Sequence, residues 1–191
     1  MTGWRQAIDL RTGVVSTSAT WKATDGHTAA FSYQVFTDRA DEHGGVVQLQ
    51  LVPGWSGTAT VTDEIDGSPA TLTDPVAKGS NPAARQDYVE VVTQRTGIDA
   101  AIASELATSP NITAIPTGVD ATAGQSIGQQ LTFPVVAGQT YTVTKFVGVD
   151  DSQDTADPVG AAQAEAAGAA AAGLPAALSA NDAAWAALWK G

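Results

Sequence analysis

The pattern of apolar residues along the chain changes near Asp150. Before that point, apolar residues recur at every second position in one segment after another, and after it alanine dominates almost to the end. Period two is typical of strands that bury one face, whereas an alanine-rich run favours helix. The sequence therefore predicts two parts: an antiparallel β-sandwich over residues 1–150 and an alanine-rich helical linker over 151–191.

The alternating segments follow one another at short intervals, with turn residues between them and no helical segment interleaved. This order is typical of an all-β fold rather than an α/β fold, in which helices would separate the strands. A length of 191 residues suits one domain. We therefore expect a large antiparallel β-sandwich (super-sandwich). Its expected strands are two joined by a turn over 8–20, alternating segments at 31–35, 47–51, 58–62, 131–135 and 141–149, and a short β-branched strand at 88–93.

Three segments allow narrower predictions. The runs at 131–135 and 141–149 flank Ala137-Gly138-Gln139, a turn sequence, and are expected to form a hairpin. The segment 74–86 holds two prolines and little apolar content, so we expect a surface loop there. The apolar spacing over 98–106 fits either a strand or a helix face, and its strand neighbours favour a strand.

The tail has few of the large apolar side chains that a core helix needs, which indicates a connector. Ser179 or Asn181 is expected to cap a final helix on which Trp185, Leu188 and Trp189 share one face. Exposed indoles usually cover a partner surface, so we expect this face to dock on a further domain that follows the chain.

The formal net charge is −11, with nine Lys and Arg residues scattered along the chain. Nucleic acids and anionic membranes require clustered positive charge, so neither is an expected partner. The absence of cysteine excludes disulfides and thiolate zinc sites. We find neither a signal peptide nor an apolar run of membrane-spanning length, so the compartment stays open, and a leader ahead of Met1 in a longer parent would allow secretion.

Three stretches, in this order along the chain, carry a resemblance. The first covers residues 9–18 (DLRTGVVSTS), the second runs from 55–57 (WSG) to the turn at 66–67 (DG), and the third is 145–152 (KFVGVDDS), ahead of the alanine-rich tail. Together they resemble the N-terminal domain of glycoside hydrolase family 65. That family includes acid trehalase and the maltose, trehalose and kojibiose phosphorylases.

The family pattern near the end of this domain has a His followed by a Trp-x-x-x-Trp segment. Trp185 and Trp189 match the tryptophan pair, whereas Asn181 and Asp182 stand where the His is expected. The Ala-, Gly- and Thr-rich composition and the stretch 36–41 (FTDRAD) look more like the secreted acid-trehalase-like hydrolases than the phosphorylases.

The resemblance implies that the β-sandwich precedes an (α/α)6 barrel, and that the catalytic general acid lies in that barrel. No residue of this chain is then expected to be catalytic. The domain would scaffold the barrel, shape its cleft or form a homodimer contact. The implied partners are the C-terminal catalytic domain of the parent chain and the parent's α-glucoside substrate, such as trehalose. Hydrolysis and phosphorolysis both remain open.

Carboxylates offer alternative chemistry, because glycosidases use a facing pair and calcium sites use oxygen ligands. We interpret the aspartates near turns as capping or solvated groups, and the acidic run that opens the tail as a solvated linker whose spacing is not that of an EF-hand. We predict no metal and no cofactor. The carboxylates considered are Asp38 with Asp41, Asp150 with Asp154, and, for calcium, Asp150, Asp151, Asp154 and Asp157.

The basic side chains receive a similar interpretation. A zinc site or a histidine-based triad would need both His27 and His43, because the chain has no other histidine and no cysteine. We expect both to be exposed loop residues. Arg11 suits a carboxylate or phosphate ligand, and a structural pair with a neighbouring Asp is an equal alternative.

Trp4, Trp21 and Trp55 provide a route to sugar binding, because an indole face matches the apolar face of a pyranose. Trp21 and Trp55 are our candidate substrate-binding residues, with packing in the core or at a domain interface as the alternative. The second functional hypothesis is therefore a free-standing carbohydrate-binding sandwich. A third is an immunoglobulin-like interaction domain, which predicts neither sugar binding nor a downstream barrel.

Overall fold

The computed structural model describes residues 1–119 and 124–191. Within these residues, eight strands form a large antiparallel sheet in the order β1-β2-β3-β4-β11-β8-β7-β6, and three form a small sheet in the order β5-β10-β9. Two helices follow the last strand. The elements are β1 (Thr2–Asp9), β2 (Val14–Lys22), β3 (Thr28–Thr37), β4 (Gly44–Pro53), β5 (Gly57–Asp66), β6 (Thr73–Asn81), β7 (Gln86–Thr93), β8 (Asp99–Thr108), β9 (Thr117–Val119), β10 (Ser126–Val135), β11 (Tyr141–Asp151), α1 (Pro158–Ala172) and α2 (Leu174–Trp189).

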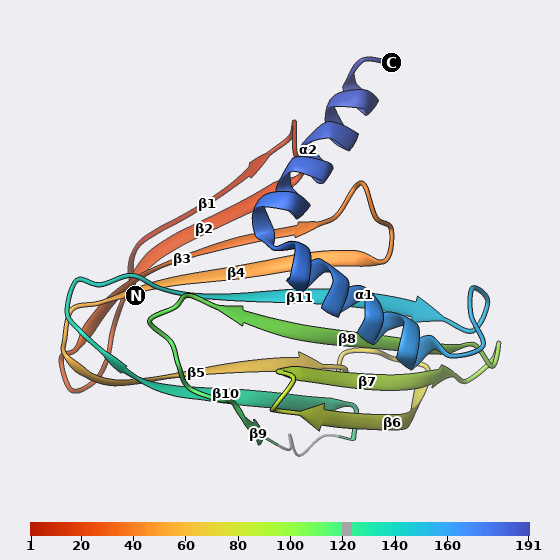
Figure 1. Ribbon diagram of the computed structural model, residues 1–191, viewed down its shortest axis with the longest axis horizontal. Coiled ribbons are helices and arrows are strands. Elements are labelled where there is room, and N and C mark those ends of the chain that lie inside the picture. The colour runs from red at the N-terminus through yellow and green to blue at the C-terminus, as the bar shows by residue number, and fades with distance from the viewer. Residues whose placement is uncertain (120–123) are drawn as a thin grey trace.

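The sheets and helices form three layers (Figure 1). The small sheet lies against one face of the large sheet, where β5 and β10 contact β6, β7 and β8. Helix α1 lies on the opposite face, across β11 and β8, and α2 continues from it toward the tip of the β1–β2 turn. The predicted antiparallel β-sandwich with a helical C-terminal segment is confirmed. No helix among the described residues is long and apolar enough to span a bilayer.

The predicted hairpin over 131–149 is wrong. Strand β10 pairs with β5 and β9 in the small sheet, whereas β11 pairs with β4 and β8 in the large sheet. The turn at 137–139 carries the chain from one layer to the other, and its Gly138 has a left-handed backbone (φ 79°) and donates its N–H to Pro53 O at 2.8 Å. Alternation marks a buried face without saying which strand pairs with which.

The predicted loop over 74–86 is also wrong, because most of it is β6, an edge strand paired only with β7. The ladder shifts register between Pro75 and Ala77. A proline that lacks an N–H is tolerated on an edge strand beside such an irregularity. The strand preferred over 98–106 is confirmed as β8.

Helix α1 packs tightly on the large sheet, so the expectation that the tail is only a connector is wrong for this helix. Ala162 and Ala166 are completely buried, and Ala162 packs on Ala101 and Ala103 of β8. The contact is made by small side chains, which let the helix approach the sheet closely. Because the tail has few large apolar side chains, its sequence did not predict that α1 packs on the sheet.

Helix α2 runs without interruption from Leu174, so the predicted helix start at Ser179 or Asn181 is wrong. Asn181 is completely buried in mid-helix. Its side-chain Nδ2 donates to Thr12 O at 2.8 Å, and its Oδ1 accepts from Arg39 N at 3.0 Å. This amide therefore joins α2 to the β1–β2 and β3–β4 turns.

The core between the two sheets is apolar at both ends and polar in the middle. Polar side chains separate two apolar clusters, one around Phe133 and one around Ile127. Lys145 Nζ of the large sheet lies 3.0 Å from Asp63 Oδ1 of the small sheet and donates to Glu64 O at 2.8 Å. The completely buried polar side chains in this layer are Asp87, Ser104 and Gln129.

The carboxyl group of Asp87 should make stability depend on pH. Burial raises its pKa, and the nearby Ser80, Lys145 and Gln129 lower it by less. An acid whose pKa is raised on folding contributes stability below its unfolded pKa, and that contribution is lost as pH rises through the folded pKa. We expect Asp87→Asn to raise stability at pH 7 by about 1 kcal/mol, roughly 2–4 °C in Tm, with a smaller gain at pH 4.5.

Thermal unfolding followed by circular dichroism at the two pH values measures this effect. A lower Tm for Asp87→Asn at pH 7, or a gain that grows as the pH falls, would contradict it.

Candidate functional site

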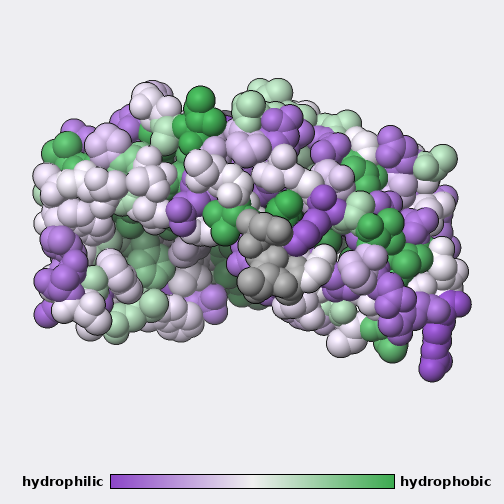
Figure 2. Space-filling model, turned by 90° about the horizontal axis from the view of Figure 1, so that it is seen from below, coloured by the Kyte–Doolittle hydropathy of each residue, from purple (hydrophilic) through white to green (hydrophobic). Residues whose placement is uncertain are grey.

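An aromatic groove opens on the inner face of the large sheet, where β2–β4 extend past the small sheet beside the free edge of β5. The space-filling view shows a hollow in its left half, with hydrophobic side chains in the depression (Figure 2). The groove has a volume of about 490 Å³. Its walls include Trp21, Phe31, Tyr33, Leu49, Leu51, Trp55, Thr58, Thr60 and Thr62.

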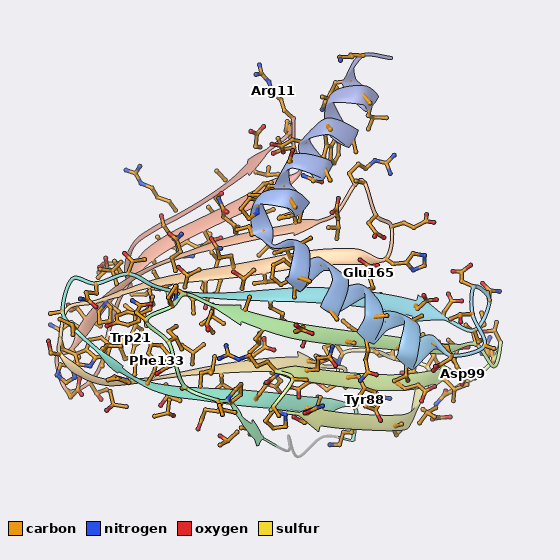
Figure 3. All side chains as sticks on the ribbon, in the orientation of Figure 1. Arg11, Trp21, Tyr88, Asp99, Phe133 and Glu165 are labelled. Atoms are coloured by element: carbon orange, nitrogen blue, oxygen red, sulfur yellow. The ribbon has the colours of Figure 1, made fainter. Side chains whose placement is uncertain are left out.

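The structure brings the two predicted sugar-binding residues, Trp21 and Trp55, together in this groove. Trp21 is 42% exposed at the end of the sandwich that also holds Phe133 (Figure 3). Trp55 is half-buried against the core around Phe133 and stacks on His27, with ring centroids 5.2 Å apart and planes at 19°. One face of Trp55 therefore already has an aromatic neighbour, whereas Trp21 presents a more open ring. Trp4 lies outside this groove, on β1.

The chemistry of the groove suits binding rather than bond cleavage. Aromatic and aliphatic side chains form one wall, and threonine hydroxyls of β5 line the other. Its described lining contains no Asp, Glu or His. A glycosidase needs two facing carboxyl groups, and this groove offers the stacking surface and hydroxyls of a sugar-binding site.

The aspartates considered as catalytic pairs mainly support the backbone. Asp38 Oδ1 accepts from Ala40 N at 2.8 Å, and Asp41 Oδ1 accepts from His43 N at 3.0 Å. Both are local bonds that shape the β3–β4 turn. Asp150 Oδ1 likewise accepts from the adjacent backbone N–H at 2.8 Å.

Glu165 of α1 reaches the same turn, and sequence reasoning missed it. Burial, followed by the proximity of Asp41, raises the pKa of Glu165, and His43 lowers it. Figure 3 shows Glu165 on the side of α1 near the β3–β4 turn. Glu165 and the β3–β4 turn are far apart in the sequence, so no sequence pattern links them. Their contact depends on how α1 packs on the large sheet. The nearby carboxylate of Asp41 makes the charged form of Glu165 less favourable.

The structure also gathers His43, Asp150 and Asp154, whose potential ligand atoms lie within 4.8 Å of one another. His43 Nδ1 contacts Val149 O at 2.9 Å and lies 3.8 Å from Asp150 Oδ2. The hydrogen bond to this carbonyl and the neighbouring carboxylates raise the pKa of His43. The neighbouring carboxylate and the Val149 carbonyl suit an ion pair with protonated His43, which would hold the β3–β4 turn to β11.

The remaining acidic residues of the tail have structural roles. Asp151 Oδ1 accepts from Gln153 N at 2.7 Å, and Asp157 caps α1 by accepting from Gly160 N at 3.0 Å. His27 pairs with Asp25, and both side chains are more than half exposed. Arg11 sits at the tip of the β1–β2 turn and points away from the sheets beside α2 (Figure 3).

A second surface is apolar and lies where the end of α2 meets the β1–β2 turn. Trp185 packs on Gly13, so closely that a side chain there would stand 2.9 Å from the indole. This ring is used within the chain, contrary to the expectation that both tryptophans face a missing partner. Leu10, Leu188 and Trp189 are 68%, 53% and 63% exposed beside it. Leu10 and Trp189 line a cavity of about 600 Å³ together with Arg11 and Asp182.

Comparisons with known proteins agree with this architecture. The family model described as the N-terminal domain of glycosyl hydrolase family 65 matches residues 1–188. The chain belongs to this family. The resemblance carried by the three sequence stretches is thereby confirmed.

Relatives of this family 65 domain include the acid trehalase of Emericella nidulans, 24% identical over 172 residues that make up 83% of this chain and 16% of the relative. The cell wall acid trehalase of Arthroderma benhamiae is 25% identical over 97% of this chain and 18% of its own length. A solved structure from human microbiome, described as a kojibiose phosphorylase, shares the fold with a TM-score of 0.81 at 11% identity. That match covers 96% of this chain and 24% of the other.

The chain thus spans less than a fifth of the two acid trehalases. In this family 65 domain, Asn181 occupies the region where the family pattern led us to expect a His. Its two buried hydrogen bonds give that position a structural role, which is to hold α2 against the turns of the sandwich.

Proposed function

We propose that this domain is the non-catalytic N-terminal β-sandwich of a family 65 enzyme that acts on an α-glucoside such as trehalose. Its role would be to scaffold the catalytic domain and to shape the approach to its cleft. Two acid trehalases among the relatives support an α-glucoside as the parent's substrate. A homodimer contact by this domain stays a prediction.

The exposed apolar end of α2 is the observation that carries the proposal. Leu188 and Trp189 project from a helix that is itself anchored by Trp185 on Gly13 and by the amide of Asn181. An exposed apolar patch on a rigid support is typical of an interface. A helical catalytic domain following residue 191 would meet this surface at once, and the sandwich would set its orientation.

The direct test is an activity assay on purified residues 1–191. With trehalose or maltose, alone or with inorganic phosphate, we expect no release of glucose or of a glucose phosphate above the blank. Release that follows the protein through a second purification step would overturn the scaffold role. Reading the coding sequence beyond residue 191 adds an independent check, since a long helical domain with an acidic catalytic residue is expected there.

The aromatic groove supports a second candidate function, a carbohydrate-binding module. Calorimetric titration with trehalose, maltose and longer glucans separates the two functions. Saturable binding that is lost in Trp21→Ala and Trp55→Ala would support the module, with each substitution costing roughly ten-fold in affinity because a stacked ring contributes about 1–2 kcal/mol. A pure scaffold would leave all these sugars unbound in this groove.

A further inference from the structure

The face of the large sheet that carries the helices has a second hollow, which neither proposed function uses. It lies on β1–β4, beyond the area covered by α1 and α2, and has a volume of about 650 Å³. This is within the range of small-molecule sites. The aromatic groove with Trp21 and Trp55 lies on the opposite face of the same sheet.

The floor of this hollow, which we call the polar hollow, consists of two rows of amide and hydroxyl side chains. Residues paired across antiparallel strands project to the same side, about 5 Å apart. Both rows therefore run across β2, β3, β4 and β11. One row is Ser16, Gln34 and Gln48, which Thr144 continues outside the lining, and the other is Ser18, Ser32 and Gln50, which Thr142 continues in the same way.

Hydrogen bonds hold part of this lattice in place. Gln48 Nε2 donates to Thr144 Oγ1 at 3.1 Å, and Gln50 Nε2 donates to Gln48 Oε1 at 3.4 Å. These bonds orient the amides of Gln48 and Gln50, which line the hollow beside the serine side chains. Oriented polar groups bind a ligand with a smaller loss of side-chain entropy than free ones.

Charge distinguishes the polar hollow from an ordinary solvated sheet face. Among the described residues, its lining contains one charged side chain, that of Arg5, and no carboxylate, in a chain with a net charge of −11. Solvated faces usually carry interspersed charges. A surface of amides and hydroxyls without acids suits a neutral ligand that is rich in hydroxyl groups.

Trp4 adds an aromatic platform at the rim of the polar hollow. It is 57% exposed and lines the hollow together with its neighbour Arg5. The β1–β2 ladder shifts register between Thr2 and Arg5, and Gly3 has a left-handed backbone (φ 63°). A bulge of this kind changes the direction of a side chain, which explains how two consecutive residues reach the same hollow.

We propose that the polar hollow is a binding site for a neutral oligosaccharide of pyranose units. Trp4 stacks on one sugar ring, and the rows of Gln and Ser side chains exchange hydrogen bonds with the hydroxyls. The hollow shares Ala7, Ser16 and Gln34 with a cavity of about 430 Å³ that reaches α2. Asp9 and Asp182 also line this cavity, and their oxygens can accept hydrogen bonds from sugar hydroxyls. Longer oligosaccharides should therefore bind more tightly than disaccharides.

The test is a chemical-shift titration of isotope-labelled 1–191 with maltose, maltoheptaose and cellohexaose, and with an oligogalacturonate as the charged comparison. With a neutral oligosaccharide we expect saturable shifts of the Trp4 indole N–H and of the Gln34, Gln48 and Gln50 side-chain amides, which line the polar hollow and not the aromatic groove. Trp4→Ala should weaken binding by about five-fold or more, and Gln34→Ala by a smaller factor. Ile115→Ala removes an exposed apolar side chain that lines neither the polar hollow nor the aromatic groove, and it should leave the affinity unchanged.

Three outcomes would overturn the proposal: no saturable shift with any neutral oligosaccharide, stronger binding of the charged ligand, or loss of binding in Trp21→Ala with retention in Trp4→Ala. In the unsubstituted protein, shifts of the Gln34, Gln48 and Gln50 side-chain amides rather than of the Trp21 and Trp55 indole N–H groups decide the location even if a variant folds poorly. The outcome is independent of the scaffold role, which depends on the absence of glucose release.

Discussion

Gly148→Ala is expected to destabilise the domain by about 3 kcal/mol, because it forces α1 away from the sheet. A side-chain carbon at Gly148 would overlap the carbonyl oxygen of Ala162 and stand 2.9 Å from Glu165 Cβ. The carbonyl belongs to the helix backbone and cannot turn aside, so the helix itself must move. Urea unfolding followed by circular dichroism and tryptophan fluorescence measures the loss.

Gly168→Ala, on α1 itself, provides the matched control for Gly148→Ala on β11. Nothing lies within 4 Å of the position that its new carbon would occupy, and the residue is exposed. An alanine in place of an exposed helical glycine should stabilise by about 0.5–1 kcal/mol. If Gly148→Ala were as stable as the unsubstituted domain, the close packing of α1 on β11 would be refuted.

Lys145→Met is expected to cost about 3–5 kcal/mol, since it leaves the carboxylate of Asp63 without its partner inside the sandwich. The two side chains are each 14% exposed and lie 3.0 Å apart, one on each sheet. The loss is a large share of the roughly 5–15 kcal/mol that stabilises a typical domain. Chemical denaturation at pH 7 gives the difference in unfolding free energy.

A double-substitution cycle with Asp63→Asn shows whether the pair is responsible. The double variant Lys145→Met with Asp63→Asn should lose less stability than Lys145→Met alone, because no unpaired charge remains. Lys22→Met, at an exposed lysine, should change stability by less than about 0.5 kcal/mol. Simple addition of the two single losses would contradict coupling between Lys145 and Asp63.

The candidate site was only partly predictable. Trp21 and Trp55 stand out in the sequence because large aromatics beside turns are natural sugar platforms. The two residues share one groove because the large sheet extends past β5. No local sequence pattern predicts that extension. The contact of Glu165 with the β3–β4 turn and the polar layer around Asp87 were invisible for the same reason, since their members come from separate strands and helices.

The sequence by itself determined the all-β class, most strand positions, the helical tail and the family. Period-two alternation, alanine content and the order of short motifs are local patterns, which can be recognised without knowing any tertiary contact. Only the tertiary structure decided that β10 and β11 belong to different sheets and that Ala162 is buried. Alternation shows that a strand has a buried face, and an alanine is compatible with surface or core. Which strand pairs with a given strand, and whether an alanine is buried, depends on the elements that pack against them, and these are far away in the sequence.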